Sequence, residues 1–194
     1  MIGIIKSYVY FTQRVKKMQG ILANLYKRRY TVTGSQLQRG AQNMESCAGI
    51  PVFISLASIA SYDGIADDPL QMMTSGHLFP GKDFSLLRYQ EIQQDRETGQ
   101  VAESEIQLVL KKDQVTMNRL GDFSNTMLFR KNQRFETVYH TPYGDMNMAV
   151  YTKEARWEEK QGTGRIHLRY DLSMQGSYAS TNELHLEYQK KEKD

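Results

Sequence analysis

The chain has 194 residues, of which 40% are hydrophobic, and it carries a formal net charge of +3. This content is enough for a folded core, but no apolar run is long enough to cross a bilayer as a helix. Cys47 is the only cysteine, which excludes an internal disulfide and paired-cysteine metal or redox motifs. Residues 1–20 lack the apolar core of a secretory signal, so we expect a cytoplasmic protein.

The net charge hides a division of the chain at Met44. Residues 1–43 hold eight basic residues and no acidic residue, a net charge of +8, whereas residues 44–194 hold 17 basic and 22 acidic residues, a net charge of −5. Apolar residues recur every three or four positions over 4–25, which is typical of a basic amphipathic helix. Such a segment would contact an anionic membrane or a nucleic acid, or act as an organelle presequence.

A further interpretation of residues 1–43 is that Met44 is the true start of the protein. We therefore divide the chain into a basic extension at 1–43, helical or disordered, and one folded domain at 44–194. Membrane or nucleic-acid contact is expected only for the extension, because the acidic balance of the domain disfavours nucleic acid.

After residue 50, β-rich segments alternate with turn residues, as in an antiparallel meander of about 8–10 strands. Segments 123–130 and 133–140 should form a hairpin around Lys131-Asn132. The meander should close or nearly close on itself, because closure removes exposed strand edges. The expected strands are 52–62, 72–79, 84–93, 101–110, 114–120, 123–130, 133–140, 144–152 and, after a break, 156–160, followed by a final hairpin.

Three hairpins can be registered from their side chains. The turn Thr141-Pro142-Tyr143-Gly144 reverses the chain, because Pro142 fixes φ and Gly144 tolerates a tight exit. It places one mostly apolar face on both flanking strands, and a turn at Lys112-Asp113 does the same. The predicted pairs are Tyr139 with Met146, Thr137 with Met148, Phe135 with Val150, Leu110 with Val115, Leu108 with Met117, and Ile106 with Arg119.

The final hairpin can be registered from charge alone. A three-residue turn at Gln175-Gly176-Ser177 gives two opposite-charge pairs on one face and two apolar pairs on the other. The charged face pairs Arg165 with Glu187, Arg169 with Glu183, and His167 with His185. The apolar face pairs Ile166 with Leu186 and Leu168 with Leu184.

Several of these segments resemble a known bacterial family. Val115–Gly121 resembles its V-x-x-x-R-x-G strand, Tyr139–Gly144 its Y-x-T-P-Y-G signature, and Tyr170-Asp171-Leu172 its Y-x-L motif. The family is the YwiB-like group of small proteins with a domain of unknown function. The resemblance covers roughly residues 50–190 and implies an all-β fold, a lipocalin-like antiparallel β-barrel. It implies no established activity or catalytic residue, and members typically begin near Met44.

A polar group is expected inside this barrel. Arg119 alternates with Val115 and Met117, and Glu91 alternates with Leu87 and Tyr89, so both charges should point inward. Tyr139 and Tyr170 fall on inward faces as well. One interpretation is a ligand site, in which Arg119 grips a carboxylate or phosphate and tyrosines donate hydrogen bonds. The other, which we favour from sequence alone, is a buried structural Arg–Glu pair capped by tyrosine hydroxyls, since small barrels often fill their interior.

Methionines and histidines give weaker signals. Methionine suits either a pocket for varied apolar ligands or an ordinary core, and we favour the core. His167 and His185 alone make a weak metal site, and Asp171 and Glu183 form no evident ligand set with them. We therefore expect a solvated histidine pair and no metal. The methionines on or near inward faces are Met117, Met127, Met146, Met148 and Met174.

No catalytic signature occurs in the chain, so we expect neither an enzyme nor a cofactor. The function that we expect is binding of a small amphipathic or anionic molecule inside the barrel. The alternative is a ligand-free structural or protein-interaction barrel with a filled core. An interior volume of a few hundred Å³ would favour the first.

Overall fold

The computed structural model describes residues 49–63, 65–94 and 101–191, which form ten β-strands in one antiparallel sheet. The order across the sheet is β6-β5-β4-β3-β2-β1-β10-β9-β8-β7. Neighbours in the chain are therefore neighbours in the sheet, except that β1 pairs with β10. The strands are β1 (Ile50–Tyr62), β2 (Ile65–Pro80), β3 (Ser85–Gln94), β4 (Val101–Lys111), β5 (Gln114–Gly121), β6 (Asn125–Phe129), β7 (Arg134–Thr141), β8 (Gly144–Lys160), β9 (Thr163–Met174) and β10 (Ser177–Lys190).

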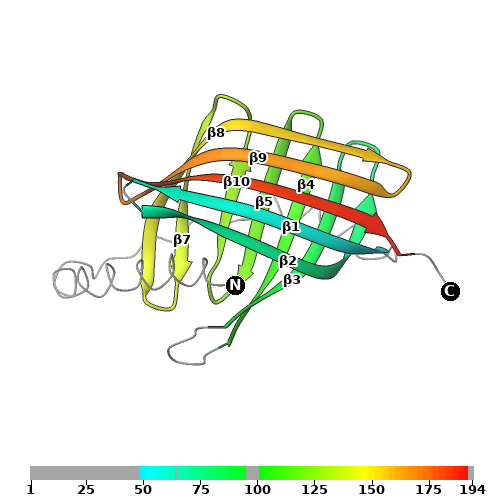
Figure 1. Ribbon diagram of the computed structural model, residues 1–194, viewed down its shortest axis with the longest axis horizontal. Coiled ribbons are helices and arrows are strands. Elements are labelled where there is room, and N and C mark those ends of the chain that lie inside the picture. Colours follow the sequence, from blue (N-terminus) through cyan, green and yellow to red (C-terminus); the bar gives the residue numbers. More distant parts are fainter. Residues whose placement is uncertain (1–48, 64, 95–100, 192–194) are drawn as a thin grey trace.

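The sheet curls round into a nearly closed barrel, with its seam between β6 and β7. Ser124 and His140 exchange two backbone hydrogen bonds at this seam, with N···O distances of 3.0 and 2.9 Å. Figure 1 shows β1, β2, β9 and β10 crossing the front of the molecule, with β4 and β5 running steeply behind them. The all-β meander that the sequence predicts is therefore confirmed.

The predicted hairpin of 123–130 with 133–140 is wrong. β6 and β7 form no ladder with each other among the described residues, and the isolated bridge between Ser124 and His140 is their one backbone pairing. Instead, β7 pairs along its whole length with β8. Asn132 N donates to Thr152 O at 2.8 Å, and Thr152 N donates to Gln133 O at 3.0 Å. The loop before β7 thus turns away from β6, and one predicted hairpin becomes the barrel seam.

Two strands are also longer than predicted. β2 begins at Ile65 and not at residue 72, because Asp68 and Pro69 continue the ladder with Ala60 and Ile59 of β1. The expected break between 152 and 156 is absent. β8 runs unbroken through a β-bulge between Thr152 and Glu154, which shifts the register by one residue.

The three registered hairpins are confirmed in every predicted pair. The final turn differs in detail, because Met174 pairs with Ser177 across a two-residue loop, Gln175-Gly176. Both loop residues have positive φ, 50° and 79°, as in a tight hairpin turn of type I′. A bulge between Tyr178 and Ser180 then restores the predicted register. The residues 1–43, which the sequence assigns to a basic extension, lie outside the described residues.

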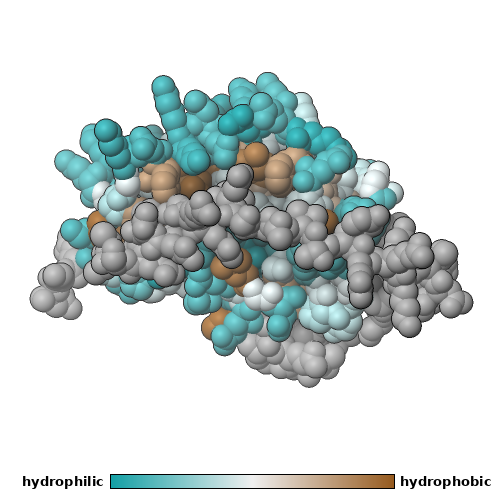
Figure 2. Space-filling view, turned by 180° about the vertical axis from the view of Figure 1, so that it is seen from behind, coloured by the Kyte–Doolittle hydropathy of each residue, from teal (hydrophilic) through white to brown (hydrophobic). Residues whose placement is uncertain are grey.

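Successive side chains along each strand alternate between the interior of the barrel and its outer surface. Hydrophilic side chains cover much of the surface in Figure 2, and hydrophobic ones show between them.

Within the described part of the chain, no helix has the length and apolarity that a membrane span needs. The side chains that point inward form one core, which includes Val52, Ile54, Leu78, Leu87, Leu108, Leu110, Phe129, Val150, Ile166, Leu168 and Leu186.

The barrel has two chemically different ends. One end, called here the Tyr188 end, holds the β8–β9 turn and the last residues of β10. Tyr188 is 1% exposed and donates a hydrogen bond to Glu159 Oε2 at 2.9 Å. Trp157 Nε1 donates to Lys111 O at 2.6 Å. Aromatic side chains anchored by hydrogen bonds therefore fill this end.

Candidate functional site

The opposite end of the barrel contains an internal ion pair, and we call it the Arg119 end. Arg119 points inward from β5 and Glu91 points inward from β3, and their side chains meet across β4. Arg119 Nη2 lies 2.8 Å from Glu91 Oε2, with the two side chains 20% and 11% exposed. The predicted inward placement of both residues is confirmed. Removing two charges from water is costly, and this pairing offsets that cost.

Three tyrosines surround the ion pair, as the sequence predicts. Tyr89 lies two residues before Glu91 on β3, Tyr139 comes from β7, and Tyr170 from β9. Burial raises the pKa of Tyr89 and Tyr139 above the ordinary 10.0, and it raises the pKa of Tyr170 to about 12. The positive charge of Arg119 opposes the increase at all three, because it favours the phenolate. The hydroxyls therefore stay protonated at neutral pH.

The interior at the Arg119 end is partly accessible to solvent. Along β1, β2 and β9, the inward-facing residues are buried toward the Tyr188 end, apart from the half-buried Ile50 at the start of β1. They become half-buried over three successive inward positions toward the Arg119 end. On β9, for example, Ile166 and Leu168 are buried, whereas Tyr170, Leu172 and Met174 are half-buried. Water can therefore approach the polar group from this end.

The structure adds polar residues that the sequence analysis did not single out. Asn125 faces Arg119 across the β5–β6 ladder. Its side-chain oxygen, Asn125 Oδ1, is buried and has no hydrogen-bond partner among the described residues. On β10, Asn182 Nδ2 donates to Ser180 Oγ at 2.9 Å, and Ser180 is buried. Asn125 alternates with Met127 and Phe129 on one face of β6, and this alternation could have predicted its inward position.

The methionines also lie where the sequence predicts. Met117 pairs with Met127 across β5 and β6, and Met148 pairs with Met174 across β8 and β9. Met117, Met127 and Met148 are buried, and Met174 is half-buried. Met146, opposite Tyr139, is half-buried as well. Flexible, polarizable side chains thus line the interior beside the ion pair.

The Thr141–Gly144 turn lies at the Arg119 end, where β7 leads into β8. Thr141 Oγ1 donates to Gly144 O at 2.8 Å and accepts from Tyr143 N at 3.1 Å. Gly144 has φ +124°, as its predicted role at the exit of the turn requires. Tyr143 is 60% exposed. The turn is therefore structural, as predicted, and its aromatic side chain faces solvent.

The histidine pair lies on the outside of the barrel. His167 and His185 are opposite each other on β9 and β10, and their rings stack with centroids 4.3 Å apart. The outer Arg165–Glu187 ion pair forms as predicted, at 3.0 Å. The predicted Arg169–Glu183 ion pair does not form among the described residues. Instead, the Glu183 carboxylate lies within hydrogen-bond distance of both histidines.

Comparison with known proteins supports the fold and the family resemblance. A family model described as a domain of unknown function (DUF1934) matches residues 54–186. The crystal structure of the ywiB protein from Bacillus subtilis is similar, with a TM-score of 0.64 and 17% sequence identity. That match covers 74% of this chain and 93% of the other, and at such identity it shows the fold alone. No curated protein matches the chain. The resemblance to the YwiB-like group is confirmed.

Proposed function

We propose, from the premise that this chain belongs to the family described as a domain of unknown function (DUF1934), that it binds a small amphipathic molecule inside the barrel. The observation that carries this proposal is the asymmetry of the interior. Apolar residues and hydrogen-bonded aromatics fill the Tyr188 end. The Arg119 end has charged and phenolic groups, with half-buried apolar residues around them. This is a lipocalin-like use of a barrel, with one end filled and the other receiving the ligand.

The chemistry of the Arg119 end indicates the class of ligand. The guanidinium has five N–H donors, more than the Glu91 carboxylate 2.8 Å away can engage, so donors remain for a second acceptor. The protonated Tyr89, Tyr139 and Tyr170 can donate as well. Asn125 Oδ1 would accept from a ligand hydroxyl or amine. A carboxylate or phosphate head group on an apolar body would therefore match Arg119 on one side and Met146, Met174 and Leu172 on the other.

The proposal is for binding and not for catalysis, in the cytoplasm. The raised tyrosine pKa values favour neutral hydrogen-bond donors over bases or nucleophiles. The single cysteine is in keeping with a reducing compartment.

A ligand-free barrel is the second candidate, and the ion pair itself favours it. Because Arg119 already contacts Glu91 at 2.8 Å, the charges could serve the fold alone. On that account, the barrel would act through its outer surface.

A binding titration separates the two candidates. A fluorescent fatty-acid analogue and the matching uncharged alcohol would be titrated into the wild-type protein and into Arg119→Met/Glu91→Gln. This double variant removes both charges and leaves no buried charge unpaired. We expect the wild type to bind the acid better than the alcohol, and the variant to lose this preference. Binding of neither probe would support the ligand-free barrel, whereas equal binding of the acid by both proteins would show that the Arg119–Glu91 pair does not select the ligand.

A further inference from the structure

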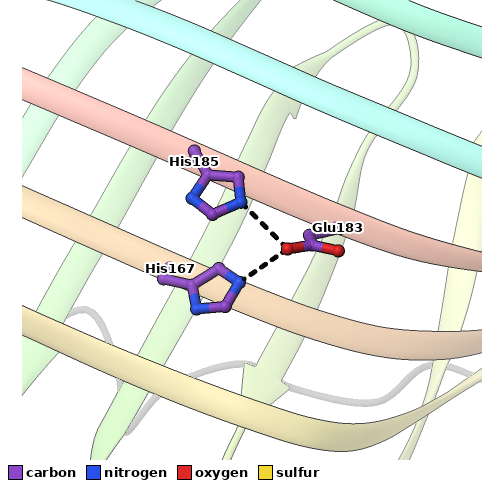
Figure 3. A group of neighbouring side chains, drawn as sticks. All are labelled: His167, Glu183 and His185. Carbon is purple, nitrogen blue, oxygen red and sulfur yellow. Dashed lines mark hydrogen bonds and ion pairs between the residues drawn. The ribbon is translucent and has the colours of Figure 1, made fainter.

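Three potential metal ligands meet on the outer face of the barrel, whereas the Arg119–Glu91 pair lies inside it. His167 comes from β9, and Glu183 and His185 come from β10, where they are two residues apart. Glu183 Oε1 lies 3.1 Å from His167 Nε2 and 2.9 Å from His185 Nε2. Figure 3 shows both rings directing a nitrogen at the same carboxylate oxygen. One ligand atom from each residue lies within 4.8 Å of the other two.

This arrangement follows from the hairpin register. His167 and His185 are directly opposite each other, so their rings stack at 4.3 Å with nearly parallel planes. Glu183 lies two residues along the same strand, on the same outer face. Its carboxylate contacts the histidines, and among the described residues it forms no ion pair with its register partner Arg169. The backbone of two paired strands therefore holds all three donors together.

The distances suit a small divalent ion. Zinc binds imidazole nitrogen and carboxylate oxygen at about 2.0–2.2 Å in tetrahedral geometry, so neighbouring ligand atoms lie roughly 3.3 Å apart. The two N···O distances here are 3.1 and 2.9 Å. An ion could therefore replace the two shared protons once the stacked rings rotate out of their parallel arrangement, because a metal ion lies in the plane of each imidazole that binds it.

A second carboxylate stands behind one of the histidines. Glu154 Oε2 of β8 lies 3.9 Å from His167 Nδ1, the ring nitrogen that points away from Glu183. Ligating histidines commonly direct their second nitrogen at a carboxylate, which fixes the tautomer and raises the basicity of the ligand. Arg156 Nη2 contacts Glu154 at 3.3 Å, and Arg169 lies opposite both Glu154 and Glu183 in the ladders. Two carboxylates thus balance the two nearby guanidinium groups.

We propose that His167, Glu183 and His185 form a binding site for a divalent transition-metal ion such as Zn²⁺. Two imidazoles and one carboxylate are a donor set that zinc accepts, with water in the remaining position. The sequence alone favoured a solvated histidine pair, and the third donor is what changes this conclusion. Because the site is on the outer face, it is independent of the ligand proposed for the interior.

The test is an isothermal calorimetric titration of Zn²⁺ into untagged, chelator-treated full-length protein. We expect one ion per chain, with binding lost in His185→Ala and in Glu183→Gln. Glu154→Gln should weaken binding roughly 10- to 100-fold, as loss of an outer-shell partner does. His140→Ala is the matched control. His140 Nδ1 lies 2.9 Å from Asp145 Oδ1 in an exposed pair that contains only one histidine. The affinity of His140→Ala for Zn²⁺ should equal that of the wild type.

A second measurement needs no variant. Imidazole resonances of His167 and His185 should shift on addition of Zn²⁺, while those of His77 and His140 stay unchanged. Cobalt(II) absorption should show the intense visible bands of a four-coordinate site. The proposal is overturned if the wild type binds no stoichiometric ion, if Glu183→Gln binds as tightly as the wild type, or if the resonances of His140 shift instead.

Discussion

Arg119 and Glu91 are charged side chains inside an otherwise mostly apolar barrel, and each depends on the other. The Glu91 side chain is 11% exposed in the wild type, and in Arg119→Met its carboxylate loses the 2.8 Å contact with the guanidinium. Breaking a buried pair costs about 3–5 kcal/mol. We expect the lower end of that range for the free energy of unfolding, because a fifth of the Arg119 side chain is exposed. Urea denaturation measures this loss.

The double variant Arg119→Met/Glu91→Gln is the control for this prediction. It removes the Glu91 charge together with the Arg119 charge, so it should recover most of the stability that the single variant loses. Equal losses in the single and double variants would show that the charge pair is not what the single substitution disrupts. Because the pair is formed, the stability of Arg119→Met alone cannot decide between a ligand site and a structural pair.

The buried tyrosines predict how stability depends on alkaline pH. Burial raises the pKa of Tyr89, Tyr139, Tyr170 and Tyr188 above 10.0 in the folded protein, and a hydrogen bond to Glu159 contributes at Tyr188. Between the unfolded and folded pKa values, the folded state therefore holds more protons, and stability falls as pH rises. This contribution is intact below pH 10 and is lost progressively above it; for Tyr170, the loss is complete above about pH 12.

Tyrosinate absorbance and circular dichroism, recorded together during an alkaline titration, check this prediction. The four tyrosines should ionise only as the β-sheet signal is lost. Ionisation of all tyrosines with an intact sheet signal would contradict it.

At the residue scale, alternation along the strands predicted which side chains share a face. It placed Arg119, Glu91 and the three tyrosines inside correctly, because each is on a strand with clear apolar neighbours. It could not predict which of several neighbours a long side chain contacts. Glu183 faces Arg169 in the register, yet its carboxylate is held by two histidines. Contacts of this kind depend on rotamers and not on register.

At the scale of elements, β9 and β10 are joined by an unusual close approach at Gly164. A Cβ at this position would overlap the ring of Tyr188, its partner across the two strands. Tyr188 cannot move freely, because it is 1% exposed and hydrogen-bonded to Glu159. We therefore expect Gly164→Ala to destabilise the protein by about 1–3 kcal/mol, as overpacking does.

The matched control is Gly176→Ala, whose new Cβ has nothing within 4 Å. Its cost should come from backbone strain alone, because Gly176 has φ +79°. Thermal melts of Gly164→Ala with and without Tyr188→Leu separate the two causes. If shortening Tyr188 does not relieve the effect of Gly164→Ala, the steric explanation is wrong.

The errors in the predicted elements share a physical cause. Asp68 and Pro69 have low strand propensity, yet pairing with β1 holds them in β2. The bulge at Thr152–Glu154 interrupts the alternation of β8, which made one strand look like two. The sequence predicts a hairpin at the β6–β7 seam because the two segments are adjacent in the chain. In each case, tertiary pairing overrides the local pattern, whereas hairpins with matched charges or apolar pairs were registered correctly.

At the scale of the whole molecule, the barrel is completed by contacts of residues 50–190 with one another. The ladders between neighbouring strands, the β1–β10 pairing and the seam at Ser124–His140 all lie within this range. A protein that starts at Met44 should therefore keep the β-rich circular dichroism and the melting temperature of the full chain. A large drop in melting temperature would show that residues 1–43 pack on the barrel and stabilise it.

The central claim is that the Arg119 end of the barrel holds a small molecule. Native mass spectrometry of the full chain, purified without a tag from its own host, tests it most directly. We predict a bound species of discrete mass, with an anionic or polar head group, that is absent from Arg119→Met/Glu91→Gln prepared in the same way. Wild-type protein that carries only its bare mass in gentle ionisation, or a bound mass that the double variant retains, would contradict the account.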